Sequence, residues 1–232
     1  MHNAGQNVET AQPAYQENHC IVRENTFQAA YSEALQRARQ ALLIRDIAAC
    51  CAAGGALLKK RPGSSETIDL CFLNKPVHIT LPQAAFSAGG DNRDVSIWEQ
   101  ILILHYLANS ERAVLKHALI NYRRLRDGAV YAPAFERRCI EPLLSAFGSE
   151  PEALIPAATA LGGVPADYGD CAVRIPALPR LDIICCLWKG DAEFGPEAAI
   201  LFDAGAEDFL CAEDMAVLCQ QIVLQLIKNR AF

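Results

Sequence analysis

Three consecutive segments near the C-terminus decide the predicted fold: LDIICCLW (Leu181–Trp188), KGDAEFGPE (Lys189–Glu197) and AAILF (Ala198–Phe202). The first is almost continuously apolar, which is typical of a strand buried on both faces. The second contains Gly, Pro and charged residues and predicts a loop. We therefore expect the two apolar runs to pair as a hairpin, with Trp188 near Ala198 and the charged loop pointing into water.

Further strands and helices are predicted on the N-terminal side of this hairpin. The alternating run Asp170–Ile175 predicts another strand, and Thr67–Leu73 and Pro76–Leu81 predict a second hairpin that turns at Asn74–Lys75. Helical spacing of apolar residues and capping residues indicate helices at these places: from Thr26 onward, Asp46–Gly55, Asp94–Asn109, Tyr131–Phe147, Pro151–Leu161 and Glu213–Asn229. The predicted fold class is α+β, a mostly antiparallel sheet packed with N-terminal, middle and C-terminal helices.

The domain organisation follows from length and from the polar N-terminus. Residues 1–25 show no periodic pattern of apolar residues, so we expect a mobile polar tail. The remaining residues, 26–232, are enough for a single globular α+β domain with a substantial core.

Charge and cysteine content narrow the functional classes. The formal net charge of −6 disfavours nucleic-acid binding, because such proteins are usually basic. No apolar run is long enough to span a membrane, and residues 1–25 lack the apolar core of a secretory signal, which favours a cytoplasmic location. The ten cysteines contain no C-x-x-C pair. We therefore interpret most of them as reduced, small buried hydrophobic residues: Cys71, Cys139, Cys185, Cys186, Cys211 and Cys219.

The chain resembles an uncharacterised prokaryotic family known as a conserved domain of unknown function. The likeness rests on Gly169-Asp170, Pro179-Arg180, the run LWKGDAEF (Leu187–Phe194), and AILFD (Ala199–Asp203), and it covers roughly residues 26–229. The family occurs mainly in anaerobic bacteria and archaea, and some members are fused to iron–sulfur modules or encoded near corrinoid and one-carbon enzymes. The resemblance implies a cytoplasmic accessory role around redox or cofactor proteins, and it supplies no catalytic residues.

Candidate ligand- or partner-binding residues lie around the predicted loop. They are Asp170, Trp188, Lys189, Asp191, Glu193 and Phe194. The predicted register places Asp203 opposite Asp182 or Ile183, about 17 Å from the loop carboxylates at ~3.4 Å per residue, so one site that uses both ends of the hairpin is disfavoured. A solvated turn that carries an aromatic residue is the simpler interpretation of this cluster.

Two histidines are weaker candidates for a metal or a tetrapyrrole. His105 lies on a predicted helix among apolar residues and would serve as an axial ligand, although a hydrogen-bonded interior histidine is the simpler interpretation. His117 lacks a second ligand at metal spacing. No metal is therefore assigned, and a corrinoid or other tetrapyrrole remains the cofactor class under consideration.

The expected function is that of a non-catalytic accessory protein that binds a cofactor or a redox or iron–sulfur partner. The sequence lacks the G-x-S-x-G, P-loop and G-x-G-x-x-G motifs. The alternative is an enzyme of corrinoid or one-carbon metabolism that uses carboxylates near the 188–197 loop. Whether the chain is an enzyme at all stays open at this point.

Overall fold

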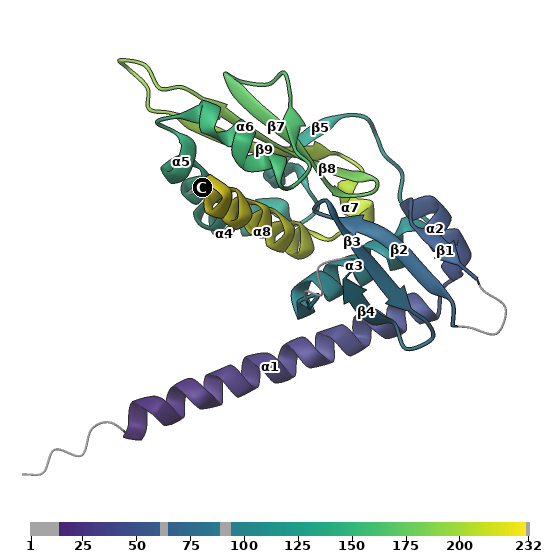
Figure 1. Cartoon of the computed structure of the whole chain (residues 1–232). Helices are drawn as coiled ribbons and strands as arrows, with labels where there is room; N and C mark the ends of the chain where they lie inside the picture. Colours follow the sequence, from purple (N-terminus) through teal and green to yellow (C-terminus); the bar gives the residue numbers. More distant parts are fainter. Residues whose placement is uncertain (1–13, 61–64, 89–93, 231–232) are drawn as a thin grey trace, which may run out of the picture.

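The computed structural model describes the backbone of residues 14–60, 65–88 and 94–230, and side chains from residue 29 onward. Its strands form two antiparallel sheets, shown in Figure 1. The first sheet contains β1 (Leu57–Lys59), β2 (Thr67–Phe72), β3 (Lys75–Thr80) and β4 (Ala85–Ala88) in that order. The second has the order β5 (Leu119–Asn121), β9 (Glu197–Asp203), β8 (Leu181–Trp188), β7 (Cys171–Leu178) and β6 (Val164–Pro165). The predicted α+β class is confirmed.

Helices fill the space beside both sheets. They are α1 (Ala14–Leu43), α2 (Ile47–Gly54), α3 (Ile97–Ser110), α4 (Gly128–Phe135), α5 (Glu141–Phe147), α6 (Leu154–Thr159), α7 (Ala206–Phe209) and α8 (Ala212–Arg230). Asp46 caps α2 by accepting the Ala49 N–H at 3.0 Å, as its position predicts. The cap of α3 is Ser96 rather than the expected Asp94, because Ser96 and Glu99 form a reciprocal capping box.

The N-terminal boundary differs from the prediction. Helix α1 begins at Ala14, upstream of the expected start at Thr26, and its C-terminal part packs against α3. Residues 1–13 of the predicted tail lie outside the described residues.

The hairpin that decides the fold forms as predicted, except that β9 begins at Glu197, one residue earlier than expected, so that Leu187 rather than Trp188 lies opposite Ala198. Strand β8 pairs with β9 so that Ile184 lies opposite Leu201 and Trp188 lies opposite Glu197. Ile183, Cys185 and Leu187 belong to the main core, whereas Ile184 and Cys186 are buried on the other face of the sheet. Every residue of the loop between the strands, 189–196, is exposed.

The first hairpin turns one residue earlier than expected. Leu73 and Asn74 have φ angles of 46° and 62°, and β3 begins at Lys75. Two successive positive φ angles match the right-handed twist of the flanking strands, and Asn adopts this conformation more readily than Lys. With this geometry Asn74 lies inside the turn, and Lys75 is the first residue of β3 that pairs with β2.

A π-helical segment, η2 (Glu136–Ile140), separates α4 from α5. The Glu141 N–H donates to the carbonyl of Glu136, five residues earlier, and Pro142 follows. Pro142 has no N–H to give to the carbonyl of Arg138, so the ordinary α-helical bond is missing where the π turn ends. The predicted helix Tyr131–Phe147 is thus two short helices joined by this segment.

The second sheet has one covered face and one more open face. Helices α5, α6 and α8 pack on the covered face, where Val173, Ile175 and Phe202 join the main core. The two sheets meet where the Leu73 N–H donates to the Ala177 carbonyl at 3.0 Å. No helix in the described ranges combines the length and apolar character that a membrane span requires.

The cysteine prediction holds in part. Cys139, Cys185, Cys186 and Cys219 are buried, and burial raises the pKa of the Cys139 thiol to about 12. Cys71 and Cys211 are exposed, which corrects the expectation for these two residues. Cys71 lies on the outward side of β2, between the buried residues Leu70 and Phe72, because side chains alternate along a strand.

Candidate functional site

Asp170 anchors the segment before β7 to the end of β8. Its Oδ2 accepts the Lys189 N–H at 2.7 Å, and its own N–H donates to the Leu187 carbonyl at 2.9 Å. The preceding Gly169 has a φ of 60°, and a Cβ there would lie 2.6 Å from the Leu187 oxygen. Gly169 therefore allows the close approach of the two backbone segments, and Asp170 bonds them together. These structural roles account for both residues without a bound ligand.

The loop carboxylate of Asp191 is engaged within its own turn. Its Oδ1 accepts the N–H groups of Glu193 and Phe194, each at 2.8 Å. These two N–H groups, that of Phe194 first, lower the pKa of the Asp191 carboxyl. Asp191 thus shapes the turn, as Asp residues do in Asx turns.

The other loop candidates are spread over the loop surface. Lys189 Nζ pairs with Glu152 on η3 (Pro151–Ala153), and this contact raises the pKa of Lys189 and lowers that of Glu152. Trp188 is 38% exposed and Phe194 is 68% exposed. The structure brings Asp170, Trp188 and Lys189 together at the end of β8. Among the described residues, no group of three or more His, Cys, Asp or Glu side chains converges as a metal site.

His105 forms a contact between helices. Its Nδ1 lies 2.9 Å from Oδ2 of Asp214 on α8, and the Cys211 thiol donates to the same oxygen at 3.3 Å. The hydrogen bond with Asp214 raises the pKa of His105 against the opposing effect of burial, and the charges of Asp214 and Glu213 add to the increase. The adjacent cavity is about 220 Å³, smaller than the ~300–1,000 Å³ of typical small-molecule sites.

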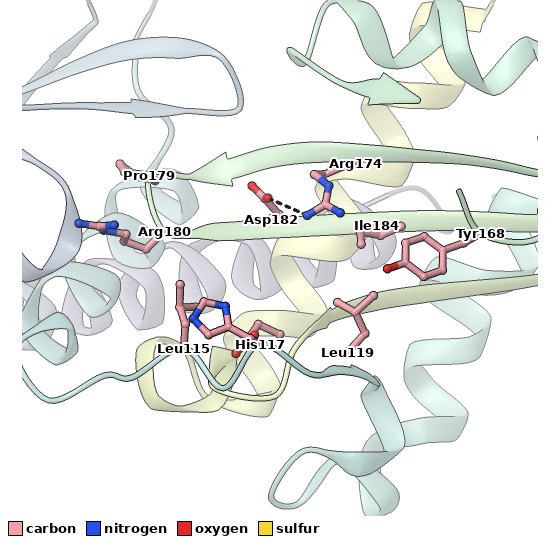
Figure 2. A pocket seen from close by; sticks show the side chains of 10 residues that line it. Leu115, His117, Leu119, Tyr168, Arg174, Pro179, Arg180, Asp182 and Ile184 are labelled. Atoms are coloured by element: carbon pink, nitrogen blue, oxygen red, sulfur yellow. Dashed lines mark hydrogen bonds and ion pairs between the residues drawn. The ribbon is translucent and has the colours of Figure 1, made fainter. Parts of the chain in front are cut away.

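A larger pocket opens on the less covered face of the second sheet, at the opposite end of the β8–β9 hairpin from the loop. Its volume is about 410 Å³, which lies within the range of small-molecule sites. The residues that line it are Leu115, His117, Leu119, Tyr168, Arg174, Pro179, Arg180, Asp182, Ile184 and Asp203. Figure 2 shows Arg174 and Asp182 on one side, Leu115 and His117 across from them, and Tyr168 and Arg180 toward opposite ends.

Strand geometry explains why these residues share one face. Arg174 pairs with Ile184 across β7 and β8, and Leu119 pairs with Asp203 across β5 and β9. Side chains of directly paired residues point to the same side of a sheet. Asp182, two residues before Ile184, also points to this side.

Two contacts on the pocket side involve the acidic residues. Arg174 Nη1 lies 3.4 Å from Asp182 Oδ2, and both side chains are nearly half exposed. Asp203 Oδ1 accepts the N–H groups of Lys116 at 2.8 Å and Gly205 at 2.7 Å. Burial raises the pKa of Asp203, but the backbone N–H groups of Lys116, Gly205 and His117 outweigh it and lower that pKa overall.

The position of the Pro179–Arg180 turn is fixed by a buried tyrosine. The hydroxyl of Tyr106 on α3 donates to the Gly54 carbonyl at 2.7 Å and accepts the Arg180 N–H at 3.0 Å. The Tyr106 ring stacks on Phe209 with 5.2 Å between centroids. One side chain therefore joins α2, α3 and the rim of the pocket.

Sequence reasoning identified His117 here only as a weak metal candidate and missed the rest of the pocket. The missed polar residues are Tyr168, Arg174, Arg180, Asp182 and Asp203. The alternation along β7 and β8 places Arg174 and Asp182 on one face, and the predicted register set Asp203 opposite Asp182 or Ile183. These observations pointed to the pocket end of the hairpin, but the prediction concentrated on the loop end.

The chain was also compared with known proteins. The comparisons with curated proteins and with solved structures gave no match. A family profile described as "Domain of unknown function (DUF3786)" matches residues 48–225, which include both sheets and every residue of the pocket. The chain therefore belongs to the DUF3786 family.

Proposed function

We propose that this protein is a non-catalytic accessory protein that binds a small-molecule cofactor in the pocket on the open face of β7, β8 and β9. The observation that carries the proposal is the 410 Å³ pocket, in which charged side chains and an aromatic ring surround the buried Ile184. A concave site with an apolar floor and a few polar groups is the usual form of a ligand site.

The loop residues support a second role, the docking of a redox or iron–sulfur protein. Trp188 and Phe194 are both exposed, and aromatic side chains are enriched at protein interfaces. The alternative of an enzyme of corrinoid or one-carbon metabolism has less support. Its proposed acid and base groups are Asp170, Asp191 and Glu193, and the first two already accept backbone N–H groups at the base and in the turn of the loop.

Ligand binding can be tested on the purified chain with two matched tryptophan variants. Leu119→Trp fills the pocket from β5, where Leu119 is 39% exposed, and Leu224→Trp adds the same side chain on α8, where Leu224 is 47% exposed. Native mass spectrometry and absorption spectra would identify a ligand that co-purifies, and thermal melting would detect binding from a cofactor panel. A ligand present at 100 times its Kd stabilises the folded state by about 2.7 kcal/mol.

The expected result is ligand binding by the parent and by Leu224→Trp, and its loss in Leu119→Trp. The proposal fails if no ligand co-purifies and no compound stabilises the parent protein. It also fails if Leu119→Trp binds as well as the parent.

A further inference from the structure

The pocket offers more unused hydrogen-bond donors than unused acceptors. Arg174 commits only Nη1 to Asp182, at 3.4 Å, and a guanidinium carries five N–H donors. The Arg180 guanidinium forms no ion pair or hydrogen bond with any residue that the structure describes. A ligand that fits these groups must bring acceptors.

One oxygen of each carboxylate in the pocket already has a partner. Asp203 accepts backbone N–H groups from the 116–117 segment and from Gly205, and Asp182 faces Arg174. Both acids keep their negative charge, but Asp203 directs Oδ1 at backbone N–H groups and Asp182 directs Oδ2 at Arg174. The positive groups open to a ligand are Arg180, which has no carboxylate partner among the described residues, and the guanidinium donors of Arg174 that Asp182 does not use.

The remaining lining is apolar or aromatic. Ile184 is 1% exposed and forms the floor, with Leu119 and Leu115 on one side and the ring of Tyr168 near one end. This surface suits a ring or short apolar chain next to the group that the arginines bind.

We propose that the ligand of this pocket is a small molecule that carries an oxyanion, a carboxylate or a phosphate, attached to an apolar or aromatic body. Arg174 binds the oxyanion, Arg180 adds positive charge at the rim, and Ile184, Leu119 and Tyr168 contact the body. Arg matches both oxyanions because its planar fork donates two parallel hydrogen bonds. This inference rests on the proposed function, since it specifies the ligand of the same site.

The test uses four probes of similar shape that differ in charge: phenyl phosphate, benzoate, benzyl alcohol and benzylamine. Binding is followed by amide chemical shifts of the ¹⁵N-labelled chain. We expect phenyl phosphate, benzoate or both to give saturable shifts at His117, Tyr168 and Ile184, and the two neutral or cationic probes to give none. The relative affinity of the two anions then distinguishes a phosphate ligand from a carboxylate ligand.

Three arginine variants link the binding to the guanidinium. Arg174→Gln should raise the Kd of the anionic probe by about tenfold or more, because it removes a charge-assisted bond. Arg174→Lys keeps the charge without the fork and should fall between parent and Arg174→Gln. Arg137→Gln removes an equal charge from an exposed site outside the pocket and should change the Kd less than about twofold. The Arg174–Asp182 pair is exposed, so these variants should melt as the parent does.

Two results would overturn the oxyanion assignment while leaving ligand binding intact. One is binding of benzyl alcohol or benzylamine at least as tightly as the anions. The other is a co-purified ligand without an acidic group. If no probe binds and Arg174→Gln leaves every spectrum unchanged, the assignment fails. The proposed function fails separately, only if the search for co-purified and added ligands is also negative.

Discussion

Replacing Tyr106 by Phe removes a single oxygen atom that connects three elements. The ring is fully buried and stacks on Phe209, and Phe can keep this packing. The hydroxyl is lost, so the buried Gly54 carbonyl loses its donor at 2.7 Å and the Arg180 N–H loses its acceptor at 3.0 Å. The Arg180 N–H lies at an exposed turn and can donate to water instead, whereas the buried Gly54 carbonyl cannot reach water.

The expected cost follows from that difference. A buried polar group left without a partner costs about 1–3 kcal/mol, so Tyr106→Phe should lower the free energy of unfolding by about 1–3 kcal/mol. Urea unfolding followed by circular dichroism measures this change as a lower midpoint at constant slope. Tyr131→Phe is the matched control, because Tyr131 is 54% exposed and should change stability by less than about 0.5 kcal/mol.

Equal stability of the two variants would refute the reasoning, since it would mean that the Tyr106 hydroxyl contributes no more than an exposed one. The same variant also tests the pocket rim. Because Tyr106 holds the Arg180 backbone, the amide signal of Arg180 should shift in Tyr106→Phe and stay in place in Tyr131→Phe.

Three further predictions concern titration, the loop and the thiols. The bond to Asp214 raises the pKa of His105 above its ordinary value of 6.5, so this bond stabilises the fold fully below pH 6.5 and loses that effect as pH rises through the raised pKa. The difference in stability between the parent and His105→Gln should therefore shrink from pH 5.5 to pH 8.5. A difference that stays constant over this range would contradict the prediction. Asp191→Ala should speed proteolytic cleavage within the loop without lowering the melting temperature, because the carboxylate holds only that turn; unchanged cleavage would show that the turn does not need it. Among the cysteines that the structure describes, peptide mapping after brief alkylation of the native protein should find modification at Cys71 and Cys211 alone, and rapid labelling of a buried thiol would be inconsistent with the packing.

The fold was predictable where a sequence pattern is compatible with a single local structure. The nearly continuous apolar run Leu181–Trp188 indicates a strand with two buried faces, and the charged segment after it indicates an exposed turn, so the pairing follows, and the register follows to within one residue. The two helix caps show the limit of such reasoning. Asp46 has no competitor nearby, whereas Asp94 precedes Ser96, and only the capping box with Glu99 decides between them.

The pocket was less predictable because it depends on contacts between distant segments. His117, Arg174 and Asp203 lie on separate parts of the chain, and nothing in their local spacing shows that they line one pocket. Neither could the sequence show that Asp170 and Asp191 would use their carboxylates on backbone N–H groups. Side chains that complete a turn and side chains that bind a ligand are of the same residue types, and only their partners distinguish them.

The π-helical segment Glu136–Ile140 restricts which length changes this region tolerates. Each residue added to or removed from an α-helix rotates everything beyond it by about 100°. A π turn takes up one extra residue with almost no net rotation, so deleting one residue here would restore a regular helix and leave Leu143 and Phe147, both fully buried, facing the core. Deleting one residue from the α-helical turns on either side would instead rotate them away. Related chains should therefore either keep the π turn with the same number of residues between Phe135 and Leu143, or lack one residue there and have a continuous α-helix with the same buried face.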